Sequence, residues 1–156
     1  MANCDIGQGD SMVINLGNHR GIVIDVGPDP VAEDRCLKAL GIKEIPLLIL
    51  SHFHADHVAG LTGAIKNRAV GQVWVSVNSA PLIESAKAQA ALKGVEMIKA
   101  VRGMSARVGP LTIRVLWPTL SATSFEEMPG DGSQINNSSI ATLITSDAFS
   151  LFAGGD

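Results

Sequence analysis

The sequence has no tyrosine, and only 4% of its residues are aromatic and 17% charged. Its two cysteines, Cys4 and Cys36, are too few for a fold held by a network of disulfides, and they leave the redox compartment undetermined. No apolar run approaches the roughly 18 residues of a membrane-spanning helix, and the longest, residues 45–50, contains Pro46. No basic segment followed by an apolar one stands at the amino end, so we expect no signal peptide in this stretch.

Basic residues are missing from the last part of the chain, because all 12 Lys and Arg precede residue 118. The net charge of -3 excludes a chain that is basic throughout, as many nucleic-acid-binding domains are. Five bases fall between Lys87 and Arg107, with Glu96 as the single acid among them. Two interpretations of this run stay open. The commoner one is an ordinary solvated surface, and the other is a patch that contacts phosphate through Lys99, Arg102 and Arg107.

What is present is apolar sequence in short runs. With 156 residues, 46% of them hydrophobic, the chain can form one domain with a sizeable core, residues 1–156. Strands are expected at residues 12–16, 22–26, 47–50, 73–77, 96–101, 111–117, 140–145 and 149–153, and helices at 30–40, 61–67 and 81–93. Strands that pair locally at both ends and alternate with helices between predict an α/β domain with a mixed sheet.

Two further segments carry local expectations. The helix at 81–93 has Ser79 as its candidate cap, and four residues are expected to face the core: Leu82, Ala86, Ala90 and Leu92. The segment 118–137 is rich in Ser, Thr, Gly and Pro, and a loop of that length is either functional or mobile.

Three of the four histidines lie within six positions, directly after an apolar run: His52, His54 and His57, with Asp56 among them. Imidazole nitrogens and carboxylate oxygens together bind divalent transition metals. In an extended segment His52 and His54 point the same way, and a turn at Ala55 directs Asp56 and His57 toward a second point nearby. One loop can thus hold two metal ions that together activate water for hydrolysis. The alternative is a histidine-rich surface loop.

Other acidic residues stand near turns or strand ends. Asp156 directly follows a strand, as a ligand at a sheet edge would. Asp25 lies in a β-rich run and is expected to orient a metal ligand, because a buried carboxylate needs a partner. Asp5 and Asp10 either serve the same purpose or belong to turn chemistry in a glycine-rich segment. His19 is expected to be a surface residue of a hairpin loop.

The pattern His-x-His-x-Asp-His is the signature of the metallo-β-lactamase superfamily, and the chain resembles that superfamily over its whole length. Four segments further resemble the metallo-β-lactamase-like domain of ComEC-type competence proteins: residues 5–11 (D-I-G-Q-G-D-S), 24–27 (I-D-V-G), 51–60 (S-H-F-H-A-D-H-V-A-G) and 136–139 (N-N-S-S). The resemblance implies the αββα fold, a sandwich of mixed β-sheets flanked by helices.

The resemblance also implies a ligand set. His52 and His54 would bind one divalent metal ion, Asp56 and His57 would bind a second, and Asp156 would bridge both. Asp56 and Asp156 would then be the catalytic carboxylates. The two ions would be Mn²⁺ or Zn²⁺, with Mg²⁺ as a further candidate.

Two features depart from the superfamily pattern. No histidine occurs between His57 and Asp156, the stretch that usually supplies a third histidine to the first metal. Asn136 and Asn137 stand where it is expected, as a ligand or substrate contact that favours Mn²⁺ or Mg²⁺, or as a turn before a strand. The superfamily pattern also continues beyond Asp156 with a last histidine ligand. We therefore expect an incomplete domain with its carboxyl-terminal part missing, doubtful metal occupancy, no activity, and an exposed sheet edge through which copies can pair.

For the parent protein the resemblance implies a metal-dependent DNA phosphodiesterase acting on single- or double-stranded DNA. The parent would lie in the cell membrane, joined to a transmembrane channel, with this domain extracytoplasmic and the fragment itself soluble. A second hypothesis is a catalytically degenerate module that guides DNA or binds a partner at the same channel, and a third is a small-substrate metallo-hydrolase.

Overall fold

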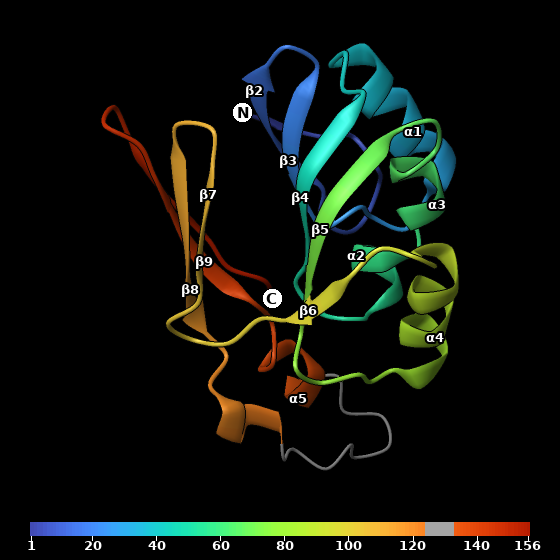
Figure 1. The fold of residues 1–156 in the computed structure, drawn as a ribbon. Helices are drawn as coiled ribbons and strands as arrows, with labels where there is room; N and C mark the ends of the chain where they lie inside the picture. Colours follow the sequence, from blue (N-terminus) through green and yellow to red (C-terminus); the bar gives the residue numbers. More distant parts are fainter. Residues whose placement is uncertain (124–132) are drawn as a thin grey trace.

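The structure, a computed structural model, describes residues 1–123 and 133–156 (Figure 1). The strands are β1 Ala2–Asn3, β2 Met12–Gly17, β3 Arg20–Ile24, β4 Glu44–Leu50, β5 Ala69–Val75, β6 Met97–Lys99, β7 Ser105–Val108, β8 Leu111–Trp117, β9 Ala141–Thr145 and β10 Ser150–Ala153. The helices are α1 Pro30–Ala39, α2 Ala55–Val58, α3 Leu61–Ala64, α4 Leu82–Ala91 and α5 Ser133–Asn136, with a 3₁₀ turn at Leu120–Thr123.

The strands form two sheets that face each other, with α1 to α4 on the far side of the first sheet (Figure 1). The first sheet has the order β1-β2-β3-β4-β5-β6; its first three strands are antiparallel, and β3 to β6 run parallel. The second sheet, β10-β9-β8-β7, is antiparallel throughout. This arrangement confirms the expected α/β domain with a mixed sheet.

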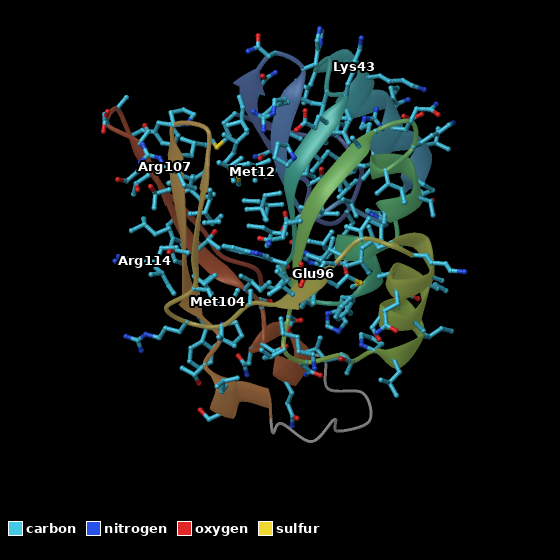
Figure 2. All side chains as sticks on the ribbon, viewed as in Figure 1. Met12, Lys43, Glu96, Met104, Arg107 and Arg114 are labelled. Atoms are coloured by element: carbon cyan, nitrogen blue, oxygen red, sulfur yellow. A yellow bond between two sulfur atoms is a disulfide. The ribbon has the colours of Figure 1, made fainter. Side chains whose placement is uncertain are left out.

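The central strand β4 is apolar on both faces because it has a core on each side. Leu48 and Leu50 belong to the cluster between the first sheet and the helices. Leu47 and Ile49 belong to the cluster between the two sheets. Figure 2 shows Met12 and Met104 entering the space between the sheets from opposite sides. A continuous apolar run is therefore the sequence pattern of a strand covered on both faces.

The amino-terminal caps of the two longer helices, α1 and α4, differ. In α1, Asp29 accepts hydrogen bonds from the N–H groups of Val31 and Ala32, and Gly41 ends the helix at φ +71°. Helix α4 begins after Pro81 with no side-chain cap, so the expected cap at Ser79 is wrong.

The buried face of α4 is also different from the expected one. Ser85, Ala88 and Leu92 are buried, whereas three of the four residues expected in the core are exposed: Leu82, Ala86 and Ala90. An alanine-rich helix has few large apolar side chains, so its hydrophobic pattern is too weak to show which face packs against the core. Small residues allow close packing there, and the Ser85 hydroxyl is satisfied by the Leu82 carbonyl at 3.1 Å.

Strand β7 was not predicted. It pairs with β8 through a tight turn in which Gly109 has φ +59°. The expected loop at 118–137 contains the 3₁₀ turn and α5, and its middle, residues 124–132, lies outside the described residues.

A disulfide joins Cys4, just after β1, to Cys36 on α1. Nothing in the sequence indicated this pairing. One bridge is not a disulfide network, but it ties the segment before β2 to the helical layer. A second link runs beside it, because the Ser11 hydroxyl donates to the Glu33 carboxyl at 2.8 Å.

Glu33 is expected to make stability depend on pH. Burial raises its pKa to about 7 from 4.5, although the Ser11 hydrogen bond and the charge of Arg68 act in the opposite direction. The protonated Glu33 carboxyl contributes fully to the free energy of unfolding below pH 4.5, where it is protonated in both the folded and the unfolded chain. This contribution is lost as the pH rises toward 7. Glu33→Gln should remove this loss and raise the free energy of unfolding above pH 7 by up to about 3 kcal/mol.

Urea unfolding from pH 4.5 to about 8 measures this effect. Glu84→Gln is the matched control, because Glu84 lies on α4 and pairs with Lys87 at 2.9 Å near the surface. The control should keep the wild-type slope of stability against pH. An unchanged slope in Glu33→Gln would contradict the assignment.

Candidate metal centre

The histidine-rich segment leaves β4 at the edge of the first sheet. Residues 51–54 are not helical, and α2 begins at Ala55 with the His54 backbone as its cap. Main-chain hydrogen bonds hold the segment from outside: Val26 N–H donates to the His57 carbonyl at 2.8 Å, and Asp10 N–H donates to the Asp56 carbonyl at 3.3 Å. The position of this loop is thus set by neighbouring backbone.

Close backbone approach explains two glycines around this loop. A Cβ atom on Gly9 would collide with the Asp56 carbonyl, and one on Gly60 would collide with the Val26 carbonyl. Gly9 also has φ +126°, a conformation that side chains disfavour. The glycine-rich segment 5–11 therefore packs directly against the histidine-rich loop.

Asp25 is the buried anchor of the site. Its carboxylate accepts hydrogen bonds from the Ser51 N–H at 2.7 Å and the Ser51 hydroxyl at 2.6 Å, and it contacts His57 Nδ1 at 3.0 Å. Asp25 itself has φ +56°. A carboxylate that receives the Nδ1–H of a histidine leaves Nε2 free as a metal ligand. Asp25 thus contacts His57 in the structure, and its role in orienting a metal ligand stays a prediction.

His52 and His54 face each other, with His52 Nε2 at 3.1 Å from His54 Nδ1. Two nitrogens bound to one tetrahedral zinc ion lie roughly 3.3 Å apart, given a metal–nitrogen distance near 2 Å. The other nitrogen of His52 contacts the hydroxyls of Ser51 at 3.1 Å and Ser139 at 3.2 Å. The two imidazoles are therefore placed as a pair of ligands.

The last residue of the chain reaches the same centre. Asp156 Oδ2 lies 3.3 Å from His57 Nε2, and Asp56 Oδ2 lies 4.0 Å from the same nitrogen. Ligand atoms of His52, His57 and Asp156 all lie within 4.8 Å of one another. His52 and His57 are buried, whereas the Asp156 side chain is 41% exposed. The imidazoles of His52 and His57 thus form the buried side of the centre, and the Asp156 carboxylate lies at its solvent-exposed side.

The two buried histidines have opposite electrostatic surroundings. Burial lowers the pKa of His52 to about 3, and the neighbouring His57 and His54 act in the same direction. Burial also lowers the pKa of His57, but Asp25, Asp156 and Asp56 outweigh it and raise the value to about 9. Burial raises the pKa of Asp25 despite its hydrogen bonds. His52 is therefore a neutral imidazole at neutral pH. His57 is protonated there, and a bound metal ion would have to displace the proton from its Nε2 atom.

This donor set fits divalent metal ions. It combines imidazole nitrogens with carboxylate oxygens, it is partly buried, and outer hydrogen bonds fix both buried rings. His52, His57 and Asp156 come together in space. His54 contacts His52, and Asp56 lies 4.0 Å from His57. Joint binding of metal ions by all five residues stays a prediction.

The asparagine pair lies beside this centre. The side-chain oxygen of Asn136 is buried and has no hydrogen-bond partner among the described residues. Asn137 is exposed, and its carbonyl accepts the Trp117 indole N–H at 2.6 Å. Their role as ligand or substrate contact stays a prediction.

Sequence reasoning did not identify two serines that support the site. Ser51 joins Asp25 to His52, and Ser139 contacts His52 across 87 positions of sequence. Both serines stand within the motifs 51–60 and 136–139, which was the available signal. Asp5 and Asp10 are exposed, and the contacts shown for Asp10 are through its backbone, so their side-chain roles also stay predictions.

The bases between Lys87 and Arg107 lie on several elements of the structure and not on one. Lys87 lies on α4, Lys99 on β6 and Arg107 on β7, and Figure 1 shows α4 and β7 at opposite sides of the molecule. In Figure 2, Arg107 and Arg114 lie on the second sheet. Arg102 is exposed, and its N–H donates to the Pro118 carbonyl at 2.7 Å. Phosphate contact by Lys99, Arg102 and Arg107 stays a prediction.

Residues 4–136 match the family model described as "Metallo-beta-lactamase superfamily". The chain therefore belongs to the metallo-β-lactamase superfamily, and its two facing sheets with flanking helices are that superfamily's fold. It is similar to "ComE operon protein 3" of Bacillus subtilis (strain 168), with 29% identity over 173 residues that cover 97% of this chain and 21% of that protein.

Solved structures support the same fold. A HARLDQ-motif mutant metallo-beta-lactamase from Cronobacter sakazakii matches with 17% identity and a TM-score of 0.62, covering 99% of this chain and 58% of that one. The metallo-beta-lactamase fold protein YhfI from Bacillus subtilis matches with 19% identity and a TM-score of 0.59, covering 95% and 55%. The chain thus spans slightly more than half the length of these structures and about a fifth of the B. subtilis protein. Among the described residues, no helix combines the length and apolar character of a membrane span.

Proposed function

We propose that this chain is part of a metal-dependent phosphodiesterase domain that acts on DNA in a competence-related uptake protein. The observation that carries the proposal is the convergence of His57 and Asp156, 99 positions apart, with His52 beside them. Superfamily membership supports the hydrolase class. The similarity to the ComE operon protein supports the competence-related setting.

The residues of the site have separate tasks in this proposal. Bound divalent ions, Mn²⁺ or Zn²⁺ with Mg²⁺ as a further candidate, would supply charge neutralisation at phosphate and activation of water. Asp25 holds His57 with Nε2 directed at the centre, and Ser51 and Ser139 hold His52. Asp56 and Asp156 are partly exposed, so their carboxylates can reach both the ions and the substrate.

The proposed setting is a parent protein in the cell membrane, with this domain extracytoplasmic and next to a transmembrane channel. The Cys4–Cys36 disulfide supports this placement, because disulfides persist mainly in oxidising compartments. Strand β10 ends the second sheet, and pairing of two copies through that edge belongs to the same proposal.

The test is cleavage of DNA by the longer parent domain, because this chain alone is expected to be inactive. With Mn²⁺ present, we expect cleavage of a labelled oligonucleotide that is lost with a chelator. Asp56→Asn should reduce the cleavage rate by roughly 100-fold or more. Changing a residue that only hydrogen-bonds to a metal ligand typically costs roughly 10- to 100-fold. Asp147→Asn is the matched control, because this exposed carboxylate lies in the turn between β9 and β10. Cleavage by Asp56→Asn at the wild-type rate, or no cleavage by the parent domain, would refute the nuclease.

A second candidate is a DNA-guiding or partner-binding module without catalysis. The observation favouring it is that no histidine occurs between His57 and Asp156. Besides His54 and His57, the side chains that contact His52 among the described residues are the hydroxyls of Ser51 and Ser139. Titration calorimetry of the parent domain separates the two functions. Absence of Mn²⁺ and Zn²⁺ binding at micromolar concentration would favour the module.

A further inference from the structure

A pocket of about 360 Å³ opens beside the metal centre. It shares Asp156 and Ser139 with that centre, and its walls include Trp117, Phe152 and Asn136. Its volume falls within the range of small-molecule binding sites, roughly 300–1,000 Å³. The catalytic arrangement proposed above makes no use of the two aromatic rings.

Both rings come from the same face of the second sheet. Trp117 pairs with Ala141, and Phe152 pairs with Leu143, two positions further along β9. Residues two apart on a strand point to the same side, so the indole and the phenyl ring lie on one face of the sheet, and both line the pocket. Trp117 is 38% exposed and Phe152 is 63% exposed, whereas Trp74 and Phe53 are buried in the two cores.

The orientation of the indole leaves its face available. Its N–H is already engaged by the Asn137 carbonyl at 2.6 Å. Gly154 has no side chain to fill the space beside Phe152, where a Cβ atom would lie 3.3 Å from the ring. The pocket is thus bounded by aromatic surface whose polar atom is satisfied.

Polar groups that suit a nucleotide stand around these rings. Asn136 lines the pocket, and its side-chain oxygen is buried without a hydrogen-bond partner in the described part of the chain. Exposed Arg102 lies near the pocket wall, because its backbone N–H donates to the carbonyl of Pro118, the residue after Trp117. An amide can read the edge of a base, and a guanidinium can contact the phosphate backbone.

We propose that this pocket binds an unpaired nucleobase of single-stranded DNA, next to the phosphate-processing centre. The inference rests on the proposed function for its choice of ligand. A base inside a duplex is stacked on both faces, so an aromatic pocket favours a base that has left the stack. The pocket therefore gives the site a preference for single strands.

Tryptophan fluorescence tests this assignment without metal. In the Trp74→Phe variant, Trp117 is the remaining tryptophan. With EDTA present, we expect a short single-stranded oligonucleotide to quench this emission to saturation. A duplex, or the same strand with abasic sites, should bind at least tenfold more weakly.

Phe152→Ala and Trp117→Ala should each weaken single-strand binding by roughly 5- to 150-fold, the effect of losing one stacked base. Because Trp117→Ala removes the fluorescent reporter, the anisotropy of a labelled oligonucleotide measures the affinity of these variants. Phe149→Ala is the matched control, because Phe149 is 44% exposed and lines a different pocket beside Asp147. Circular dichroism melting confirms folding of each variant, and Phe152→Ala removes a ring that is already largely exposed.

The outcomes separate this proposal from the nuclease. Ring-dependent binding of single strands in EDTA, without cleavage by the parent domain in Mn²⁺, would keep the pocket and remove the nuclease. Cleavage in Mn²⁺ with unchanged affinity of both ring variants would keep the nuclease and overturn the pocket. Equal binding of abasic and intact strands, or concentration-dependent self-association that buries Trp117 without DNA, would also overturn it.

Discussion

Replacing Asp25 with alanine is expected to lower the free energy of unfolding by about 3–5 kcal/mol, the usual cost of removing one partner of a buried ion pair. Asp25 is 2% exposed and His57 is 1% exposed. The substitution removes the carboxylate that accepts from the N–H and hydroxyl of Ser51 and contacts the His57 imidazole. These buried polar groups would be left without their partner.

Asp25→Asn separates folding from metal binding. Asparagine tolerates the positive φ of this position better than alanine, and its amide oxygen can still accept from Ser51. An amide cannot match a carboxylate as a partner for His57 Nδ1–H. We therefore expect a smaller loss of stability than with alanine, together with roughly 10- to 100-fold weaker binding of Mn²⁺ or Zn²⁺.

Urea unfolding and titration calorimetry measure the two effects on the same preparations. Asp147→Asn again serves as the control, since it changes an exposed carboxylate outside the centre. Wild-type metal affinity in Asp25→Asn would show that the contact with His57 does not organise the site.

The features that the sequence predicted well depend on local patterns. Strand β8 was expected at the bounds found, because its alternating apolar residues face one core. The histidine-rich loop was also singled out, since its candidate ligand types and their spacing lie within one short segment, and its metal binding stays a prediction. Helix α4 was placed correctly but turned the wrong way, because an alanine-rich helix lacks a strong apolar stripe.

The features that were missed depend on contacts between distant segments. Ser139 contacts His52 because the two sheets bring their loops to the same edge. Cys4 bonds to Cys36 because the amino-terminal segment lies against α1. Asp25 was expected to orient the loop, but its joint contact with Ser51 and His57 requires the parallel pairing of β3 with β4. Residue types alone cannot identify such partners, since many serines and cysteines fit equally well.

Removing the Cys4–Cys36 disulfide is expected to have the second large effect. The double substitution Cys4→Ser with Cys36→Ser opens a loop of 32 positions. Loop-closure entropy predicts a loss of about 3–4 kcal/mol in the free energy of unfolding. Metal affinity should also fall, because the same amino-terminal segment carries the backbone contacts of Asp10 to Asp56 and Gly27.

The mechanism of that second effect can be separated from general destabilisation. Cys4 N–H donates to the Ser11 carbonyl, so the bridge holds the start and end of the glycine-rich segment near α1. A reductant should weaken metal binding by the wild-type chain but leave the double variant unchanged. Asp29→Ala, which removes the cap of α1, is the matched control: it should lower stability by roughly 1 kcal/mol, with little change in metal affinity. If the double variant bound metal as tightly as wild type at a temperature where both are folded, the bridge would stabilise the fold without positioning the loop, because every other contact of Asp56 is retained.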